Sequence, residues 1–354
     1  MNPDQYFDKM RFSCGKFMMS KTRIYLDTKY WIYLRDANRG NGHELSIKIL
    51  NEFRRLVKSG KAICPLSAQI YSELLKQYPK ELRILMAGLM DELSQQYCFI
   101  NPLAIAGQEI ITFIRNREST SKGIPPSDNV NYVWTKVPFI LGENCPSLNN
   151  LPERETELLQ ESFLNHLSNI SLKEKITISP SEAPIQSFRD LAQQLNEGKD
   201  VHQEWKSFQD VYLMEIVGYL DYLREDLDKM QRFLFYKEPG QMVSSETSLK
   251  VNHAQVLSEL IYHAFQTDTV GKSLPQIDIR AKIHAQIRFD KLQRFRENDF
   301  MDIGHAAWAL PYCQYFFTEK RLAGIIEQTK LDLKYGAKVL TDENDILECL
   351  LGLD

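Results

Sequence analysis

The chain has few cysteines, and none of them lies in a metal-binding or redox motif. Six cysteines are spread over 354 residues, and no two form a C-x-x-C pair. Closely spaced cysteine pairs are typical of zinc sites and of thioredoxin-like redox centres, so the sequence argues against both classes. We therefore expect reduced thiols and a cytoplasmic protein, because disulfides rarely persist in the cytosol.

Long apolar runs and an excess of positive charge are also absent. No window approaches the roughly 20 apolar residues that a membrane span needs, and residues 1–23 show no pattern of a secretory signal. We therefore expect no membrane partner. The net charge is −4, so any contact with nucleic acid must come from a local basic patch.

Short apolar runs alternate with helical patterns at both ends of the chain, which predicts a parallel sheet with crossover helices. The helical patterns are segments with apolar residues three to four positions apart. Strands are predicted at 23–27, 61–66, 97–100, 315–318 and 338–341, and helices at 28–37, 45–57, 79–93, 277–295, 299–310, 321–330 and 344–351.

The middle of the chain is predicted to be helical throughout. Its longest periodic stretch, 201–236, would form one helix of roughly 50 Å, packed on helices of this chain or of a second copy. We thus predict an N-terminal extension at 1–22, an α/β domain built from 23–103 and 276–354, and a large all-helical insertion at 104–275.

Acidic residues recur where a predicted strand ends or a predicted helix begins. Acids at strand ends of an α/β sheet converge on one edge, where open sheets bind ligands. Such carboxylates repel one another unless a cation lies between them, and Mg²⁺ combines one or two carboxylates with substrate phosphates. The pattern favours metal-assisted phosphodiester cleavage. The acids are Asp27, Glu73, Asp299, Asp302 and Glu319.

Three segments together resemble the PIN-like nuclease family, in particular a larger bacterial branch. They are Ile24-Tyr25-Leu26-Asp27-Thr28 followed by Trp31, Pro65-Leu66-Ser67 with Glu73, and the stretch 298–320. The resemblance covers the two ends of the chain and does not include the insertion. It implies a parallel sheet flanked by helices, an acidic cleft that holds Mg²⁺ or Mn²⁺, and hydrolysis of RNA or, less often, DNA.

The resemblance also implies roles for individual acids as catalytic metal ligands. The first-strand acid corresponds to Asp27, the mid-domain glutamate to Glu73, and the helix-opening acid to Asp302, which small residues follow four and five positions later. The family pattern places a fourth acid two residues after a threonine, which is Thr318 in this chain, and Lys320 occupies that position. Glu319 is the nearest substitute.

Two further residues of the 298–320 stretch allow alternative interpretations. Asp299 is either the N-cap of the following helix or a second metal ligand, because its spacing puts it on the same helix face as Asp302. His305 lies three residues beyond Asp302 on that face. It could steady a water or a scissile phosphate, or it could orient a neighbouring carboxylate.

A local basic cluster precedes the helix-opening acids. Substrate phosphates are the partner that such a patch fits in a protein of negative net charge. Alternatively, the cluster is a solvated helix face that is partly balanced by Asp278, Asp290 and Glu297. The predicted substrate contacts are Arg288, Lys291, Arg294, Arg296 and, beyond the fourth acid, Lys320.

These observations favour a Mg²⁺- or Mn²⁺-dependent endonuclease that acts on RNA. Two alternatives stay open at this point. The first is a PIN-fold binding or regulatory module without cleavage activity, which contacts a partner protein or a second copy through the insertion. The second is a DNA nuclease with a role in phage defence.

Overall fold

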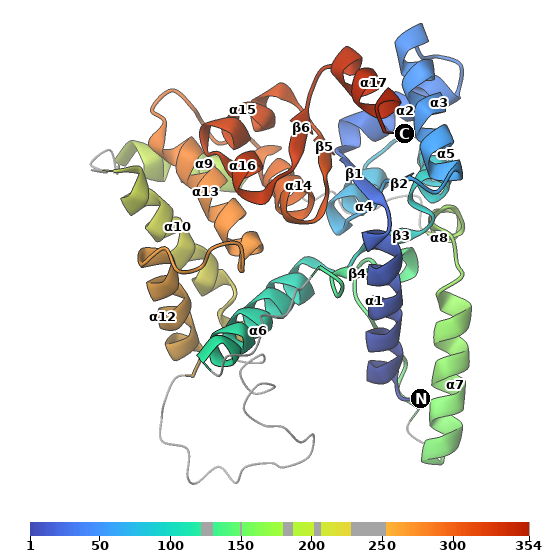
Figure 1. Cartoon of the computed structure of the whole chain (residues 1–354), viewed down its shortest axis with the longest axis horizontal. Helices are drawn as coiled ribbons and strands as arrows, with labels where there is room; N and C mark the ends of the chain where they lie inside the picture. The colour runs from blue at the N-terminus through green and yellow to red at the C-terminus, as the bar shows by residue number, and fades with distance from the viewer. Residues whose placement is uncertain (122–129, 149–150, 180–186, 202–206, 228–252, 354) are drawn as a thin grey trace. The chain divides into compact units, whose positions relative to one another are not determined.

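The computed structural model describes residues 1–121, 130–148, 151–179, 187–201, 207–227 and 253–353 (Figure 1). The chain divides into two compact units. Unit 1 comprises Met1–Pro102, Asn129–Ser187 and Gly304–Asp354, and unit 2 comprises Leu103–Asp128 and Phe188–Ile303. Unit 1 contains the sheet, whereas the described part of unit 2 consists of helices and loops.

The centre of unit 1 is a four-stranded parallel sheet, which confirms the predicted α/β class. Its strands, in the order β2 (Ala62–Ile63), β1 (Thr22–Leu26), β5 (Tyr315–Phe317) and β6 (Lys338–Leu340), lie side by side (Figure 1). The two ends of the chain therefore build one sheet, as predicted. In the register of β1 and β5, Leu26 lies opposite Phe317, so the residues that follow these strands meet at one edge.

The third apolar run leaves this sheet and pairs elsewhere. β3 (Tyr97–Phe99) is antiparallel to β4 (Trp134–Lys136) in a separate two-stranded sheet. A single parallel bridge joins Cys98 to Leu66. The run predicted at 61–66 is therefore divided, because its first part pairs with β1 and its last residues turn toward β3.

Helices cover both faces of the sheet, because the central strands carry apolar side chains on both. Tyr25 points to one face while Ile24 and Leu26 point to the other, and all three are fully buried. Among the helices, α17 packs on α3 and α3 packs on α2. Their bounds are α2 (Thr28–Asn38), α3 (Glu44–Lys58), α4 (Ala68–Leu75), α5 (Lys80–Ser94), α14 (Asp299–Tyr312), α15 (Lys320–Gln328), α16 (Leu331–Tyr335) and α17 (Glu343–Leu351).

Residues predicted to be an N-terminal extension form a helix that is part of unit 1. α1 (Pro3–Met19) packs on β4, and Phe17 stacks on Tyr97 with ring centroids 4.4 Å apart. Gly15 permits this approach, since a Cβ atom at that position would lie 2.0 Å from the Asn131 carbonyl oxygen. The remaining elements of unit 1 are the 3₁₀ helix η1 (Val137–Phe139), α7 (Glu153–Leu167) and α8 (Leu172–Ile178).

Unit 2 has a helical core of its own, built on the packing of α10 against α12 and α13. Buried residues such as Ile216, Leu220 and Ile261 form this core. The helices of unit 2 are α6 (Pro102–Ser121), α9 (Arg189–Val201), α10 (Phe208–Tyr222), α12 (His253–Gln266) and α13 (Pro275–Phe289), and the start of α14 also belongs to it.

Two helix predictions in this region were wrong in extent. The stretch 201–236 is not one helix, because Ser207 has an extended backbone and its side chain caps α10 by accepting from the Asp210 amide. Residues 202–206 and 228–236 lie outside the described residues. The helix predicted at 277–295 ends at Phe289, where Asp290 takes an extended conformation.

The boundaries of the two compact units differ from those of the predicted domains. Residues 129–187, predicted to lie in the insertion, belong to unit 1, whereas 276–303, predicted to lie in the α/β domain, belong to unit 2. In the part of the chain that is described, no helix is both long and apolar enough to cross a bilayer.

Candidate functional site

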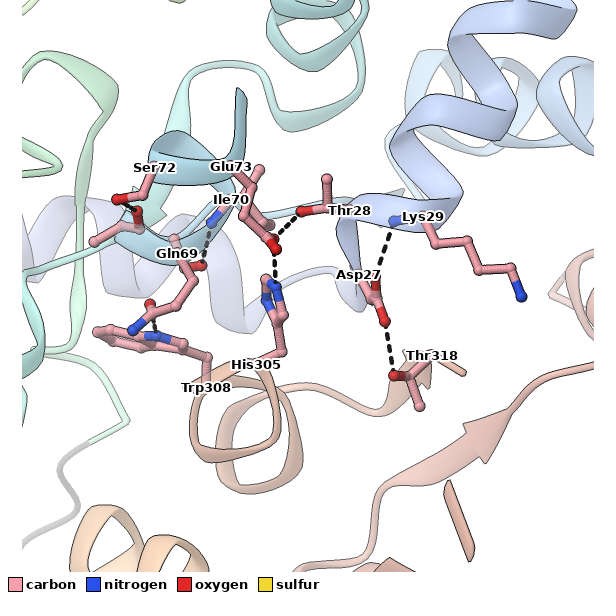
Figure 2. Close-up of polar contacts among 12 residues, drawn as sticks. Asp27, Thr28, Lys29, Gln69, Ile70, Ser72, Glu73, His305, Trp308 and Thr318 are labelled. Atoms are coloured by element: carbon pink, nitrogen blue, oxygen red, sulfur yellow. Dashed lines mark hydrogen bonds and ion pairs between the residues drawn. The ribbon is translucent and has the colours of Figure 1, made fainter. Parts of the chain in front are cut away.

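Asp27 occupies the carboxyl end of the central strand β1 and begins the next helix. It is the N-cap of α2, where its Oδ1 accepts the Lys29 amide at 2.9 Å. Its Oδ2 accepts the Thr318 hydroxyl, also at 2.9 Å, from the end of β5 (Figure 2). The Asp27 residue is 5% exposed. The strand register thus places this acid at the sheet edge that the sequence predicted.

Glu73 lies beside this edge, on α4, and is held by side chains from two other elements. Its Oε2 accepts a short hydrogen bond from the Thr28 hydroxyl, next to Asp27 in the chain, and lies 2.8 Å from His305 Nε2 on α14 (Figure 2). Thr28 therefore links the two acids, and His305 approaches Glu73 from the C-terminal part of the chain. The structure brings together Asp27, Glu73 and His305.

The other ring nitrogen of His305 continues this network into the core. The Tyr25 hydroxyl lies 2.8 Å from His305 Nδ1 and 2.6 Å from Ser67 Oγ. Ser67 Oγ, in turn, accepts the Ile70 amide at 3.3 Å as the N-cap of α4. Tyr25, Ser67 and His305 are each at most 1% exposed. We call the row Ser67–Tyr25–His305–Glu73 the buried relay.

Close packing of α14 against α4 fixes the two helices of this relay. Gly304 leaves room for the Gln69 side chain, because a Cβ atom there would lie 2.8 Å from Gln69 Cγ. One turn later, the Trp308 indole donates a short hydrogen bond to the Gln69 amide oxygen (Figure 2). Gly304 and Trp308 of α14 thus both lie against Gln69 of α4. His305 lies on the same side of α14 as Trp308, and Glu73 lies one turn after Gln69 on α4, so His305 faces Glu73.

The environment of Glu73 favours its ionised form. Burial alone would raise the pKa of this carboxyl group, but the interactions with His305, Thr28 and Lys76 outweigh burial and lower the pKa below its ordinary value. Hydrogen bonds to the charged form are the usual cause of such a decrease. Glu73 is therefore a carboxylate at neutral pH.

The lowered pKa of Glu73 predicts a pH-dependent stability difference. A depressed pKa contributes stability above the ordinary value of about 4.3, and this contribution is lost as the pH falls through the folded-state pKa. Glu73→Gln should therefore unfold more easily than wild type near neutral pH and approach wild type in acid. Urea unfolding of both proteins at several pH values measures this, with Glu81→Gln on the exposed surface of α5 as control. A pH-independent gap would contradict it.

The remaining predicted acids have different environments. Asp302 is partly buried on α14, three residues before His305 in the chain but within unit 2. Asp299 is the first residue of α14, and its Oδ2 accepts the Arg296 amide at 2.8 Å. Glu319 is exposed at the N-cap of α15, without a side-chain cap bond. The sharing of one ion by Asp27 and Asp302 stays a prediction.

The donor set at this edge suits a hydrated hard cation. Among the residues that the structure describes, no three His, Cys, Asp or Glu side chains form a group that could hold a metal. Asp27 and Glu73 nevertheless supply two carboxylates, and Mg²⁺ often binds through one or two carboxylates with water and phosphate oxygens as its other ligands. Two carboxylates would suit a Mg²⁺ or Mn²⁺ ion that keeps several waters, and the binding of such an ion here stays a prediction.

The predicted basic contacts are divided between ion pairs and exposed positions. Arg288 pairs with Glu215 at 2.5 Å and Arg294 pairs with Asp200 at 2.6 Å. Of the acids predicted to balance the cluster, Asp278 accepts a hydrogen bond from Tyr212 in the core of unit 2. Lys291, Arg296 and Lys320 are exposed, the first two in unit 2 and the third in unit 1.

Four residues that hold the site, Tyr25, Thr28, Ser67 and Thr318, are not among the predicted site residues. The sequence predicts Tyr25 as a residue of a buried strand, and Thr28, Ser67 and Thr318 lie in the segments that carry the family resemblance without a predicted role in the site. A sequence signal existed for the threonines, since each directly adjoins an acid at a strand end. No local signal distinguishes Tyr25, because its partner His305 lies 280 residues away in the chain.

Comparison with known proteins identifies no relative. No protein-family model, no curated protein and no solved structure matches this chain. Function must therefore be inferred from the residues at the sheet edge and their chemistry.

Proposed function

We propose that unit 1 is a PIN-like nuclease domain and that the protein is a Mg²⁺- or Mn²⁺-dependent endonuclease that acts on RNA. The observation that carries this proposal is the pair of carboxylates, Asp27 and Glu73, at the carboxyl end of the central parallel strand. Ligands of open α/β sheets bind at this end, and hard oxygen donors suit a phosphodiester-cleaving cation.

Each residue of the site would have a distinct task. Asp27 and Glu73 would hold the cation, with Asp302 and Glu319 as candidates for further carboxylate ligands. When bound, such a cation supplies an activated water and neutralises charge on the phosphate. Thr318 and Thr28 orient the two acids through the hydrogen bonds described above. Hydrolysis would leave a 5′-phosphate and a 3′-hydroxyl without a covalent enzyme intermediate.

Substrate binding would use the exposed cations. Lys291 and Arg296 in unit 2 and Lys320 in unit 1 form no ion pair with the described residues, whereas Arg288 and Arg294 would have to exchange Glu215 and Asp200 for the substrate. The loop that carries Lys291 is fixed, because the buried Lys199 ammonium donates to the carbonyls of Ile287, Asp290 and Gln293 at 2.5–2.7 Å.

The alternative is a binding or regulatory module that does not cleave. One observation favours it: both oxygens of Asp27, and Oε2 of Glu73, already accept hydrogen bonds from protein groups. A cation must then share these oxygens with their donors. This alternative predicts binding of nucleic acid with or without Mn²⁺ and no products.

One digest separates these functions. The full chain is incubated with labelled RNA, single-stranded DNA or duplex DNA, each with Mg²⁺, with Mn²⁺ or with EDTA. We expect RNA products with 5′-phosphate ends in either metal and none in EDTA. Cleavage of DNA alone would indicate the DNA nuclease, binding without cleavage would indicate the non-cleaving module, and cleavage in EDTA would contradict metal dependence.

A further inference from the structure

The hydrogen-bond partners in the buried relay determine where its protons lie. Each hydroxyl carries one proton that it can donate, and an ionised carboxylate can only accept. The direction of every hydrogen bond in the row Ser67–Tyr25–His305–Glu73 can therefore be worked out from its two ends.

At the Ser67 end, the hydroxyl proton of Ser67 must point toward the Tyr25 oxygen. Ser67 Oγ already accepts the Ile70 amide, and the Tyr25 hydroxyl at 2.6 Å is its other partner among the described residues. If Tyr25 donated to Ser67 instead, the Ser67 proton would lack an acceptor in a fully buried site, and an unsatisfied buried donor is destabilising. Ser67 therefore donates to Tyr25, and Tyr25 donates to His305 Nδ1.

At the Glu73 end, a proton on Nε2 is required independently. The carboxylate accepts from Thr28 and lies 2.8 Å from His305 Nε2. A lone pair on Nε2 at that distance would face the negative oxygen, so Nε2 must carry a proton. Both ends agree on one state of the ring, with a proton on Nε2 and an acceptor lone pair on Nδ1.

We propose that Ser67 and Tyr25 are positioning residues whose directed hydrogen bonds hold His305 as the Nε2–H tautomer, and that His305 in turn fixes the orientation of the Glu73 carboxylate. In this state neither ring nitrogen is available to a cation or a phosphate. His305 thus takes the second of the roles open to it from the sequence, that of orienting a carboxylate, and acts on the reaction only through Glu73.

Ring-¹⁵N NMR of the full chain tests the state of His305 without any assay of activity. The protein has seven histidines, and loss of one set of signals in His305→Gln identifies the ring. At neutral pH we expect a directly attached proton on Nε2 and none on Nδ1. A proton on Nδ1, in the other tautomer or in the imidazolium, would overturn the proposal.

A matched pair of variants tests the contribution of Tyr25. Tyr25→Phe removes the donor to Nδ1 and should move the Nδ1 resonance toward that of an imidazole nitrogen without a hydrogen bond. Tyr30→Phe is the control, because it removes another buried hydroxyl of unit 1, which donates to the Thr341 carbonyl at 2.9 Å, outside the relay. Equal spectra for the two variants would show that Tyr25 only packs.

The catalytic consequence rests on the proposed function and is measured separately. Loss of a group that orients a metal-binding carboxylate typically lowers activity about 10–100-fold. We expect Tyr25→Phe to lower kcat by about tenfold at the low end of this range, with little change in KM, and Tyr30→Phe to leave both unchanged. An unchanged kcat in Tyr25→Phe would refute the positioning role. Absence of cleavage by wild type would refute only the proposed function, because the NMR result stands by itself.

Discussion

Asp27→Asn should lower the rate of phosphodiester cleavage by about 10³-fold, equivalent to roughly 4 kcal/mol of transition-state stabilisation. The substitution removes the negative charge that would hold a cation at the end of β1. Asparagine is as good an N-cap as aspartate, so α2 should keep its start. The amide nitrogen that replaces one oxygen cannot accept the Thr318 hydroxyl, so an unchanged free energy of unfolding must accompany the loss if it is to report on the charge of residue 27.

Asp342→Asn is the matched control for this experiment. Asp342 is also an aspartate N-cap, and its Oδ1 accepts the Asn344 amide at 2.9 Å as Asp27 accepts Lys29. It is exposed, whereas Asp27 is buried. Initial rates with labelled RNA in Mn²⁺ should fall for Asp27→Asn alone. Full activity in Asp27→Asn would remove the central residue from the proposed site, and equal losses in both variants would point to a general effect of charge.

The central strands β1 and β5 were predicted well because most of their residues are buried. β1 begins and ends one residue before the predicted run 23–27, and β5 and β6 each end one residue before the predicted runs 315–318 and 338–341. Continuous apolar runs are typical of parallel strands covered by helices. The pairing of the run 61–66 was not predictable in this way. Periodicity does not show that its first residues pair with β1 and its last residue pairs with β3.

Helix ends set by distant residues could not be predicted in the same way. α13 ends at Phe289 in a loop held by the ammonium of Lys199, almost 90 residues earlier in the chain. By contrast, the break before α10 had a local signal. Ser207 followed three residues later by Asp210 is the spacing of a helix start, and the structure places the N-cap at that serine.

In the candidate site, too, some features depend on local sequence and others on residues that are distant in the chain. Asp27 and Glu73 were predictable, because each has a fixed place relative to a strand or a helix start. The hydrogen bonds that orient them come from Thr318 and His305, which reach the site only after the C-terminal strands join the sheet. Sequence spacing can suggest that acids gather at an edge, but it does not determine which donors hold them.

Gly15→Ala should destabilise the protein by about 3 kcal/mol, the upper end of the usual cost of overpacking. The added Cβ atom would lie 2.0 Å from the carbonyl oxygen of Asn131, and that atom belongs to the backbone and cannot rotate away. α1 would have to move from the segment that leads into β4, which also disturbs the stacking of Phe17 on Tyr97. The higher helix propensity of alanine, worth up to about 1 kcal/mol, offsets only part of this.

Gly324→Ala, in the same unit, should have the opposite effect on stability. Gly324 lies inside α15, and a Cβ atom there would meet no atom within 4 Å. Alanine should then stabilise the helix by about 0.5–1 kcal/mol. Thermal and urea unfolding of both variants, followed by circular dichroism, measures the two effects. The close approach of α1 to residue 131 predicts shifts of opposite sign. A Gly15→Ala variant as stable as Gly324→Ala would show that α1 does not pack against this segment in solution.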